Sequence, residues 1–208
     1  MRFDSLRLAA VALLLTGLSA GKALACACCA SEAERFEGSR PLETYEKEEL
    51  GKIRLAAGAR LSLNEAGFDA VKGIVRPAEE YKVTLEKTQA QWIFTFTDAG
   101  GRSGRLAIPS PRSARLFEID PRVSSVRNEK PPAQVATVWL YKEWRFEHPL
   151  DAAGFFSSAS DARITLILHG TGNHCFSADD FSHWTLLAKG RNTRYTLYGE
   201  LVPSSAKE

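Results

Sequence analysis

Three residue types are scarce in this chain of 208 residues, which contains one methionine, four histidines and four cysteines. Few histidines and methionines leave few ways to build a metal site or a catalytic base. An excess of one charge is lacking too, because 27 lysines and arginines face 25 aspartates and glutamates. Without a basic excess the chain cannot displace many counterions from a nucleic acid, so we expect no nucleic-acid partner.

Catalytic signatures are also missing. The turn Gly170-Thr171-Gly172 is not followed by the Lys-Ser or Lys-Thr of a phosphate-binding loop. The chain has neither the Gly-x-Ser-x-Gly of a nucleophile elbow nor the His-Glu-x-x-His of a zinc protease. After the N-terminal segment, no apolar run approaches the ~18 residues that a membrane-spanning helix needs. We therefore expect a binding, accessory or structural protein rather than an enzyme.

The N-terminus has the three parts of a secretory signal. Arg2 and Arg7 make its start basic, residues 8–20 form an uncharged apolar run of 13 residues, and Ala23 and Ala25 occupy the positions that signal peptidase reads. As a helix this run would span about 20 Å, short of the roughly 30 Å hydrocarbon core of a membrane. The pattern predicts a cleaved signal peptide over residues 1–25 and an extracytoplasmic location, either periplasmic or secreted.

Cleavage after residue 25 would leave Cys26 at the new N-terminus, and a lipoprotein is therefore an alternative. The residues before it match a lipobox poorly, because Ala23 and Leu24 stand where leucine and then a small residue are usual. Lipid at Cys26 is the one route by which we expect this chain to contact a membrane. In that case it would be a lipid-anchored structural protein of the envelope.

Charge is unevenly placed along the rest of the chain. Residues 30–50 have a net charge of −4, and residues 102–130 have a net charge of +4. The basic segment could bind a phosphate, a lipid headgroup or an acidic glycan. Solvated surface arginines are common, however, and we favour a solvated edge.

From residue 50 onward, apolar and polar residues alternate in short runs separated by turn-forming residues. This period of two, with many aromatic and β-branched residues, is typical of half-buried strands. We predict an all-β fold, an antiparallel sandwich or barrel of about ten short strands. The inward-facing series are Tyr81, Val83 and Leu85, then Trp92, Phe94 and Phe96, then Leu106 and Ile108, then Val138, Leu140, Trp144 and Phe146, then Ile164, Leu166 and Leu168, then Trp184, Leu186 and Ala188, and last Tyr195, Leu197 and Leu201.

A single β-rich domain is predicted over residues 51–208. Residues 26–50 form a cysteine-rich start and an acidic lead-in, either helical or loose, which Pro41 divides. Short helical pieces are expected at residues 64–70 and 177–181, the second with Ser177 as its N-cap.

The cysteines are the first group that could carry chemistry. Cys26, Cys28 and Cys29 lie together at the start of the mature chain, and Cys175 lies far away near its end. In an exported protein we expect Cys175 to form a disulfide with one of the first three, which would stabilise the fold by roughly 4–5 kcal/mol on the chain-entropy model. Alternatively the thiolates bind copper or zinc, with His174 or Cys175 as a fourth ligand.

A histidine-bearing turn is the second group. The candidates for a site at a rim of the sheet are His169, Asn173, His174, Asp179, Asp180 and His183. Loops at the rims of β-scaffolds often hold functional sites. The histidines could equally be structural, and Asn173 could supply a left-handed turn residue.

These observations predict an exported β-rich binding or accessory protein of the cell envelope. Its partner would be a small ligand, a soft metal ion such as copper or zinc, or another envelope protein. The alternatives are the lipid-anchored structural protein, and a hydrolase that uses His169, His174 and His183.

Overall fold

The fold is that of a computed structural model, which describes residues 35–63, 71–119, 140–157, 161–173 and 175–204. Within these ranges the chain forms one antiparallel sheet of eleven strands, a single α-helix and a short 3-10 helix, so the all-β prediction is confirmed. The elements are β1 (Arg35–Pro41), α2 (Thr44–Lys52), β2 (Arg54–Ser62), β3 (Glu80–Lys87), β4 (Gln91–Thr97), β5 (Ser103–Pro109), β6 (Ser113–Ile119), β7 (Leu140–Pro149), β8 (Asp151–Gly154), β9 (Arg163–Gly172), η4 (Ala178–Asp180), β10 (Phe181–Lys189) and β11 (Arg194–Val202).

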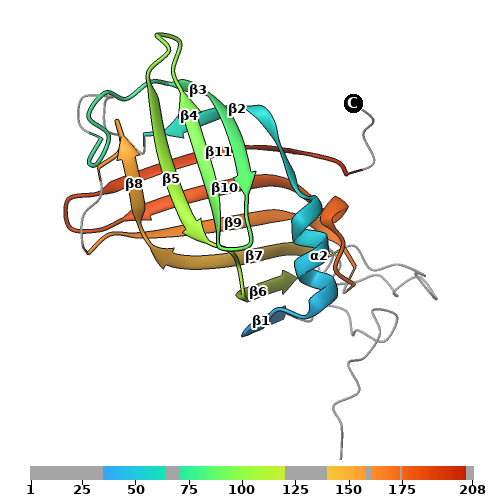
Figure 1. Cartoon of the computed structure of the whole chain (residues 1–208). Helices are drawn as coiled ribbons and strands as arrows, with labels where there is room; N and C mark the ends of the chain where they lie inside the picture. Colours follow the sequence, from blue (N-terminus) through green and yellow to red (C-terminus); the bar gives the residue numbers. More distant parts are fainter. Residues whose placement is uncertain (1–34, 64–70, 120–139, 158–160, 174, 205–208) are drawn as a thin grey trace, which may run out of the picture.

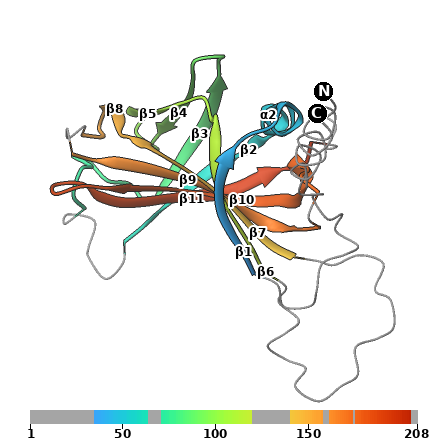
Figure 2. The same ribbon diagram turned by 90° about the horizontal axis from the view of Figure 1, so that it is seen from below.

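The sheet curls strongly. Its strands run in the order β1-β6-β7-β9-β10-β11-β2-β3-β4-β5-β8. Strands β3–β5 cross in front of β9–β11 at a steep angle in Figure 1, and the view from below shows the bend between the two halves (Figure 2). The sheet is therefore a half-barrel that wraps around its own apolar face.

The connection between β7 and β8 explains the curl. Only Leu150 separates these strands along the chain, yet they stand eight strand-to-strand steps apart in the sheet. In a flat sheet eight steps at ~4.8 Å would separate them by about 38 Å, whereas the two Cα–Cα steps from residue 149 to residue 151 span at most about 7.6 Å. The sheet must bend until β5, the partner of β8, approaches β7.

The concave face holds the apolar core that the alternation predicts. In the series that start at Tyr81, Trp92, Leu106, Ile164, Trp184 and Tyr195, every residue is buried except Leu85, which is half-buried. In the run that becomes β7, Leu140, Trp144 and Phe146 are buried, and Val138 lies outside the described residues. Aromatic rings fill the centre, where Trp184 lies 6.3 Å from both Phe94 and Phe96 between ring centroids.

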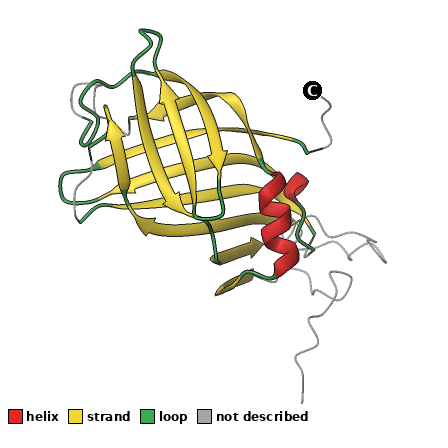
Figure 3. Ribbon diagram, viewed as in Figure 1, coloured by secondary structure: helices red, strands yellow, loops and turns green. Residues whose placement is uncertain are grey.

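The acidic lead-in is only partly helical. Arg35–Pro41 is a strand, β1, which pairs with β6 at the edge of the sheet, and the helix α2 begins after it at Thr44. The backbone N–H of Glu43 donates to the carboxylate of Glu46 at 2.8 Å, which satisfies one of the free donors at the helix start. Figure 3 shows α2 beside η4 at one end of the sheet.

The two short helical predictions have different outcomes. The structure forms η4 at residues 178–180, and the Ser177 hydroxyl accepts from the backbone N–H of Asp179 at 3.3 Å, as the predicted cap requires. The predicted piece at 64–70 and the signal peptide at 1–25 lie outside the described residues. None of the described helices is long and apolar enough to cross a membrane.

Candidate functional site

His169 and His183 lie side by side on the outer face of the sheet. They are directly opposite each other in the pairing of β9 with β10, and their ring centroids are 5.6 Å apart. Their neighbours Leu168 and Trp184 point into the core, so the two imidazoles project away from it.

A carboxylate flanks each histidine. Glu143 on β7 is opposite His169, and Glu200 on β11 is opposite His183. Both carboxylate oxygens of Glu143 are occupied, because the Tyr141 hydroxyl donates to one at 2.5 Å and the Nε of Arg145 donates to the other at 2.8 Å. Glu200 is exposed and has no ion pair with another described residue. Glu200 is therefore the carboxylate of this row that is available to a ligand.

The two imidazoles differ in their hydrogen bonds. The Nδ1 of His183 is 2.8 Å from the Ser182 hydroxyl, and the Nε2 of His169 is 3.4 Å from the Thr185 hydroxyl. Each ring thus keeps one nitrogen without a hydrogen bond to any described residue. Burial, followed by the nearby charge of His183, lowers the pKa of His169, and Glu143 opposes this shift. The neutral form of His169, which can bind a metal, is therefore favoured.

A bulge in β2 opens a groove beside this row. Gly199 pairs with Ala59 and Leu201 with Leu55, so three residues of β2 stand opposite Glu200 alone. The groove has a volume of about 500 Å³. It is lined by Ala56, Gly58, Ala59, Arg60, Glu80, Tyr81, His183, Tyr198, Gly199 and Glu200.

The other predicted rim residues lie at the end of the sheet and are engaged in structural contacts. Asn173 accepts from the backbone N–H of Cys175 at 2.8 Å, and Asp179 accepts from that of Ser204 at 2.6 Å. Asp180 pairs with Lys142 at 2.8 Å. The structure thus brings two of the predicted residues, His169 and His183, together on the outer face, while these three support the loop between β9 and β10.

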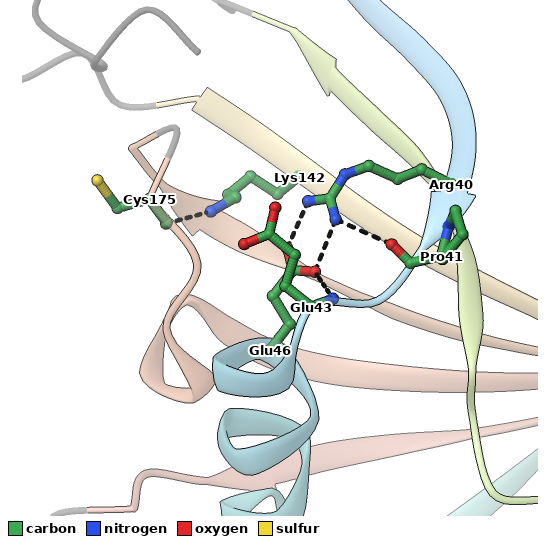
Figure 4. Close-up of polar contacts among 6 residues, drawn as sticks. All are labelled: Arg40, Pro41, Glu43, Glu46, Lys142 and Cys175. Atoms are coloured by element: carbon green, nitrogen blue, oxygen red, sulfur yellow. Dashed lines mark hydrogen bonds and ion pairs between the residues drawn. The ribbon is translucent and has the colours of Figure 1, made fainter. Parts of the chain in front are cut away.

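Lys142 is a buried cation that was not predicted from the sequence. Its side chain is only 1% exposed, and its ammonium group donates to the carbonyl of Cys175 at 2.9 Å as well as to Asp180. Figure 4 shows it near the ion pair of Arg40 with Glu46, at the end of the sheet that α2 covers. The sequence signal was present, since Lys142 occupies an inward position between Leu140 and Trp144.

The thiol predictions concern mainly residues outside the described ranges. Cys26, Cys28, Cys29 and His174 are among those residues, and Cys175, the one cysteine that the structure describes, is exposed and not in a disulfide. In the described part of the chain, no three side chains of histidine, cysteine, aspartate or glutamate converge as a ready metal site.

No protein-family model, no curated protein and no solved structure matches this chain. Its function must therefore be inferred from the arrangement of side chains described above.

The Lys142–Asp180 pair gives a first prediction. Replacing Asp180 with asparagine should lower the free energy of unfolding by about 2–4 kcal/mol, because the buried ammonium group loses its counter-charge. Urea denaturation would measure the change. Asp151→Asn, at an exposed carboxylate of β8, is the matched control and should change stability little. Equal losses in the two variants would contradict the structural role of the pair.

The lowered pKa of His169 gives a second prediction. As the pH falls below the ordinary value of 6.5, the unfolded chain takes up a proton before native His169 does, so acidification should reduce stability. The variant His169→Gln should lose less stability than the native chain between about pH 7.5 and 5. His148→Gln is a comparison variant, because burial lowers the pKa of His148 as well. An acid sensitivity unchanged in His169→Gln would contradict this assignment.

Proposed function

We propose that this protein is an exported binding protein of the cell envelope, and that it holds a divalent transition-metal ion at His169 and His183. The proposal of export depends on the signal sequence at residues 1–25. The proposal of metal binding depends on one observation, the direct opposition of the two imidazoles at 5.6 Å on the outer face of the sheet.

The donor chemistry favours zinc or copper(II). Imidazole nitrogen suits both ions, and hard cations such as Mg²⁺ and Ca²⁺ prefer oxygen. The hydrogen bond between Ser182 and the Nδ1 of His183 leaves the Nε2 of that ring as its metal-binding atom. On His169 the atom without a described hydrogen bond is Nδ1.

The surroundings favour an open site. Glu143 is held by Tyr141 and Arg145, so it supports His169 through its charge and does not act as a ligand. Glu200 could supply an oxygen ligand if its side chain turned toward His183, its partner across the strands. The adjoining groove leaves room for water or a small molecule at the remaining coordination positions, which is typical of sites that exchange ligands.

Metal titration of the mature protein tests the proposal. Zn²⁺ should bind with one ion per chain, and His169→Ala or His183→Ala should each weaken binding by about tenfold or more. His148→Ala removes a histidine on a different strand, β7, and should leave the affinity unchanged. Calorimetry gives the affinities, and NMR should locate the shifts on β9 and β10. Zinc-induced NMR shifts on β9 and β10 that survive the double variant His169→Ala/His183→Ala would contradict the proposal.

A hydrolase is the second candidate, favoured by the distance of 2.8 Å between the Ser182 hydroxyl and the Nδ1 of His183. This distance is within the reach of a nucleophile and its base. The two functions respond differently to Ser182→Ala. That change would abolish turnover by a serine hydrolase and its labelling by a fluorophosphonate, whereas a metal site would keep both of its imidazole ligands.

We also propose a disulfide between Cys175, which the structure shows as a free thiol, and Cys26, Cys28 or Cys29, which lie outside the described residues. Cys175 is exposed at the end of the sheet covered by α2 (Figure 4). From the start of β1 at Arg35, the six residues back to Cys29 can reach about 20 Å. The N-terminal thiols are therefore tethered to an edge of the same sheet.

Intact-mass analysis of the exported protein, alkylated before and after reduction, tests the disulfide. We expect Cys175 to be protected from alkylation until the protein is reduced, because its sulfur would be bonded. Cys175→Ser should release one of the three N-terminal thiols for alkylation. Alkylation of Cys175 in the unreduced native protein would contradict the pairing. The same masses would reveal lipid at Cys26, the mark of the alternative structural protein.

A further inference from the structure

A second groove lies beside α2. The residues that line it are distant in sequence from His169 and His183. We name it the basic groove and define it by its lining residues, Lys47, Leu50, Gly51, Lys87, Thr88, Gln89, Trp92, Ser110, Pro111 and Arg112. Its volume is about 670 Å³. Three separate pieces of chain form it: the helix α2, the turn between β3 and β4, and the turn between β5 and β6.

The lining has one sign of charge. Lys47, Lys87 and Arg112 are its charged residues, and it contains no carboxylate. Among the residues that the structure describes, neither Lys47 nor Arg112 has an ion-pair partner, and both are exposed. Of the acidic residues of α2, Glu46 is buried against Arg40 and Glu49 pairs with Lys52, while Glu48 is exposed and does not line the groove.

Lys87 neutralises the end of the helix. Its ammonium group donates to the carbonyls of Leu50 and Gly51, each at 3.0 Å, and also to that of Ile53. These carbonyls form the negative end of the helix dipole, roughly half an elementary charge. Burial lowers the pKa of Lys87 to about 8, so near pH 7 its ammonium group is mostly charged and more than offsets this half charge. The groove then keeps a positive potential, and the donors of Lys47 and Arg112 stay available.

Hydrogen bonds hold together the two turns that line the groove. The Ser110 hydroxyl donates to the Thr88 carbonyl at 2.8 Å and so joins the two turns. The Thr88 hydroxyl accepts from the backbone N–H of Gln91 at 3.0 Å, and the Lys87 ammonium lies 4.8 Å from the centre of the Trp92 ring. The charged side chains therefore project from a framework that needs little ordering when an anion binds.

We propose that the basic groove binds a phosphate group. The Arg112 guanidinium matches two oxygens of a phosphate through its planar fork, and Lys47 adds a second positive charge. The exposed amide of Gln89 is a further donor at the same rim. Inorganic phosphate, a small phosphomonoester and a phospholipid headgroup all offer this chemistry. The proposal is independent of the metal site, which lies on other strands.

Titration of the mature protein with inorganic phosphate and with glycerol 3-phosphate, in the presence of EDTA, tests the proposal. Calorimetry should show binding that Lys47→Gln/Arg112→Gln weakens by about tenfold or more. Lys82→Gln/Arg105→Gln is the matched control, because it removes the same charge from exposed strand positions outside the groove. Arg112→Lys should recover only part of the affinity, since it keeps the charge and loses the fork.

Vesicles distinguish the sources of the phosphate. Flotation with phosphatidylglycerol vesicles, compared with phosphatidylcholine, should retain the native chain more than the Lys47→Gln/Arg112→Gln chain if a headgroup is the ligand. Binding of the soluble phosphates without flotation supports a soluble ligand. Equal losses in the two double variants, or no binding to phosphate in any form, would overturn the proposal. The His169→Ala/His183→Ala chain should bind phosphate like the native chain.

Discussion

The passage of the chain from β7 through Leu150 into β8 is the constraint on which the curled sheet depends. It brings together the two ends of the nine-strand arc from β7 to β8, although no strand pairing joins β5 directly to β7. Leu150 itself is buried, and its backbone N–H donates to the carbonyl of Ala162 at 2.9 Å. The aromatic core fills the space that this closure creates, and the outer face is left for polar side chains.

The alternation of residues predicted the strands well because burial on one face of a strand imposes a period of two. It could not predict how the strands pair, since register depends on contacts between distant segments. The strand β1 was missed for a different reason. Its sequence is short, polar and broken by Gly38 and Pro41, and it forms a strand because β6 offers it a free edge.

The candidate site was predictable only in part. His169 and His183 belong to neighbouring strands joined by a short loop, and their closeness in sequence made their meeting plausible. Glu143 and Glu200 could not have been added, because each reaches the row through a strand pairing. The basic groove was even less predictable from the sequence, since α2 and two turns from different parts of the sheet supply its charges. The buried Lys142, by contrast, could have been predicted from the sequence, because it occupies an inward position in an apolar series.

The pairing of β2 with β11 has a consequence for the order of folding. These strands lie near opposite ends of the described chain, at residues 54–62 and 194–202, and their seam joins the two halves of the half-barrel. A nascent chain cannot form this seam until its last strand has emerged, and contacts so distant in sequence form slowly. Until then the inward faces of β2–β5 have no opposite wall to cover them. The apolar faces of these strands therefore stay uncovered until β11 is available to pair with β2.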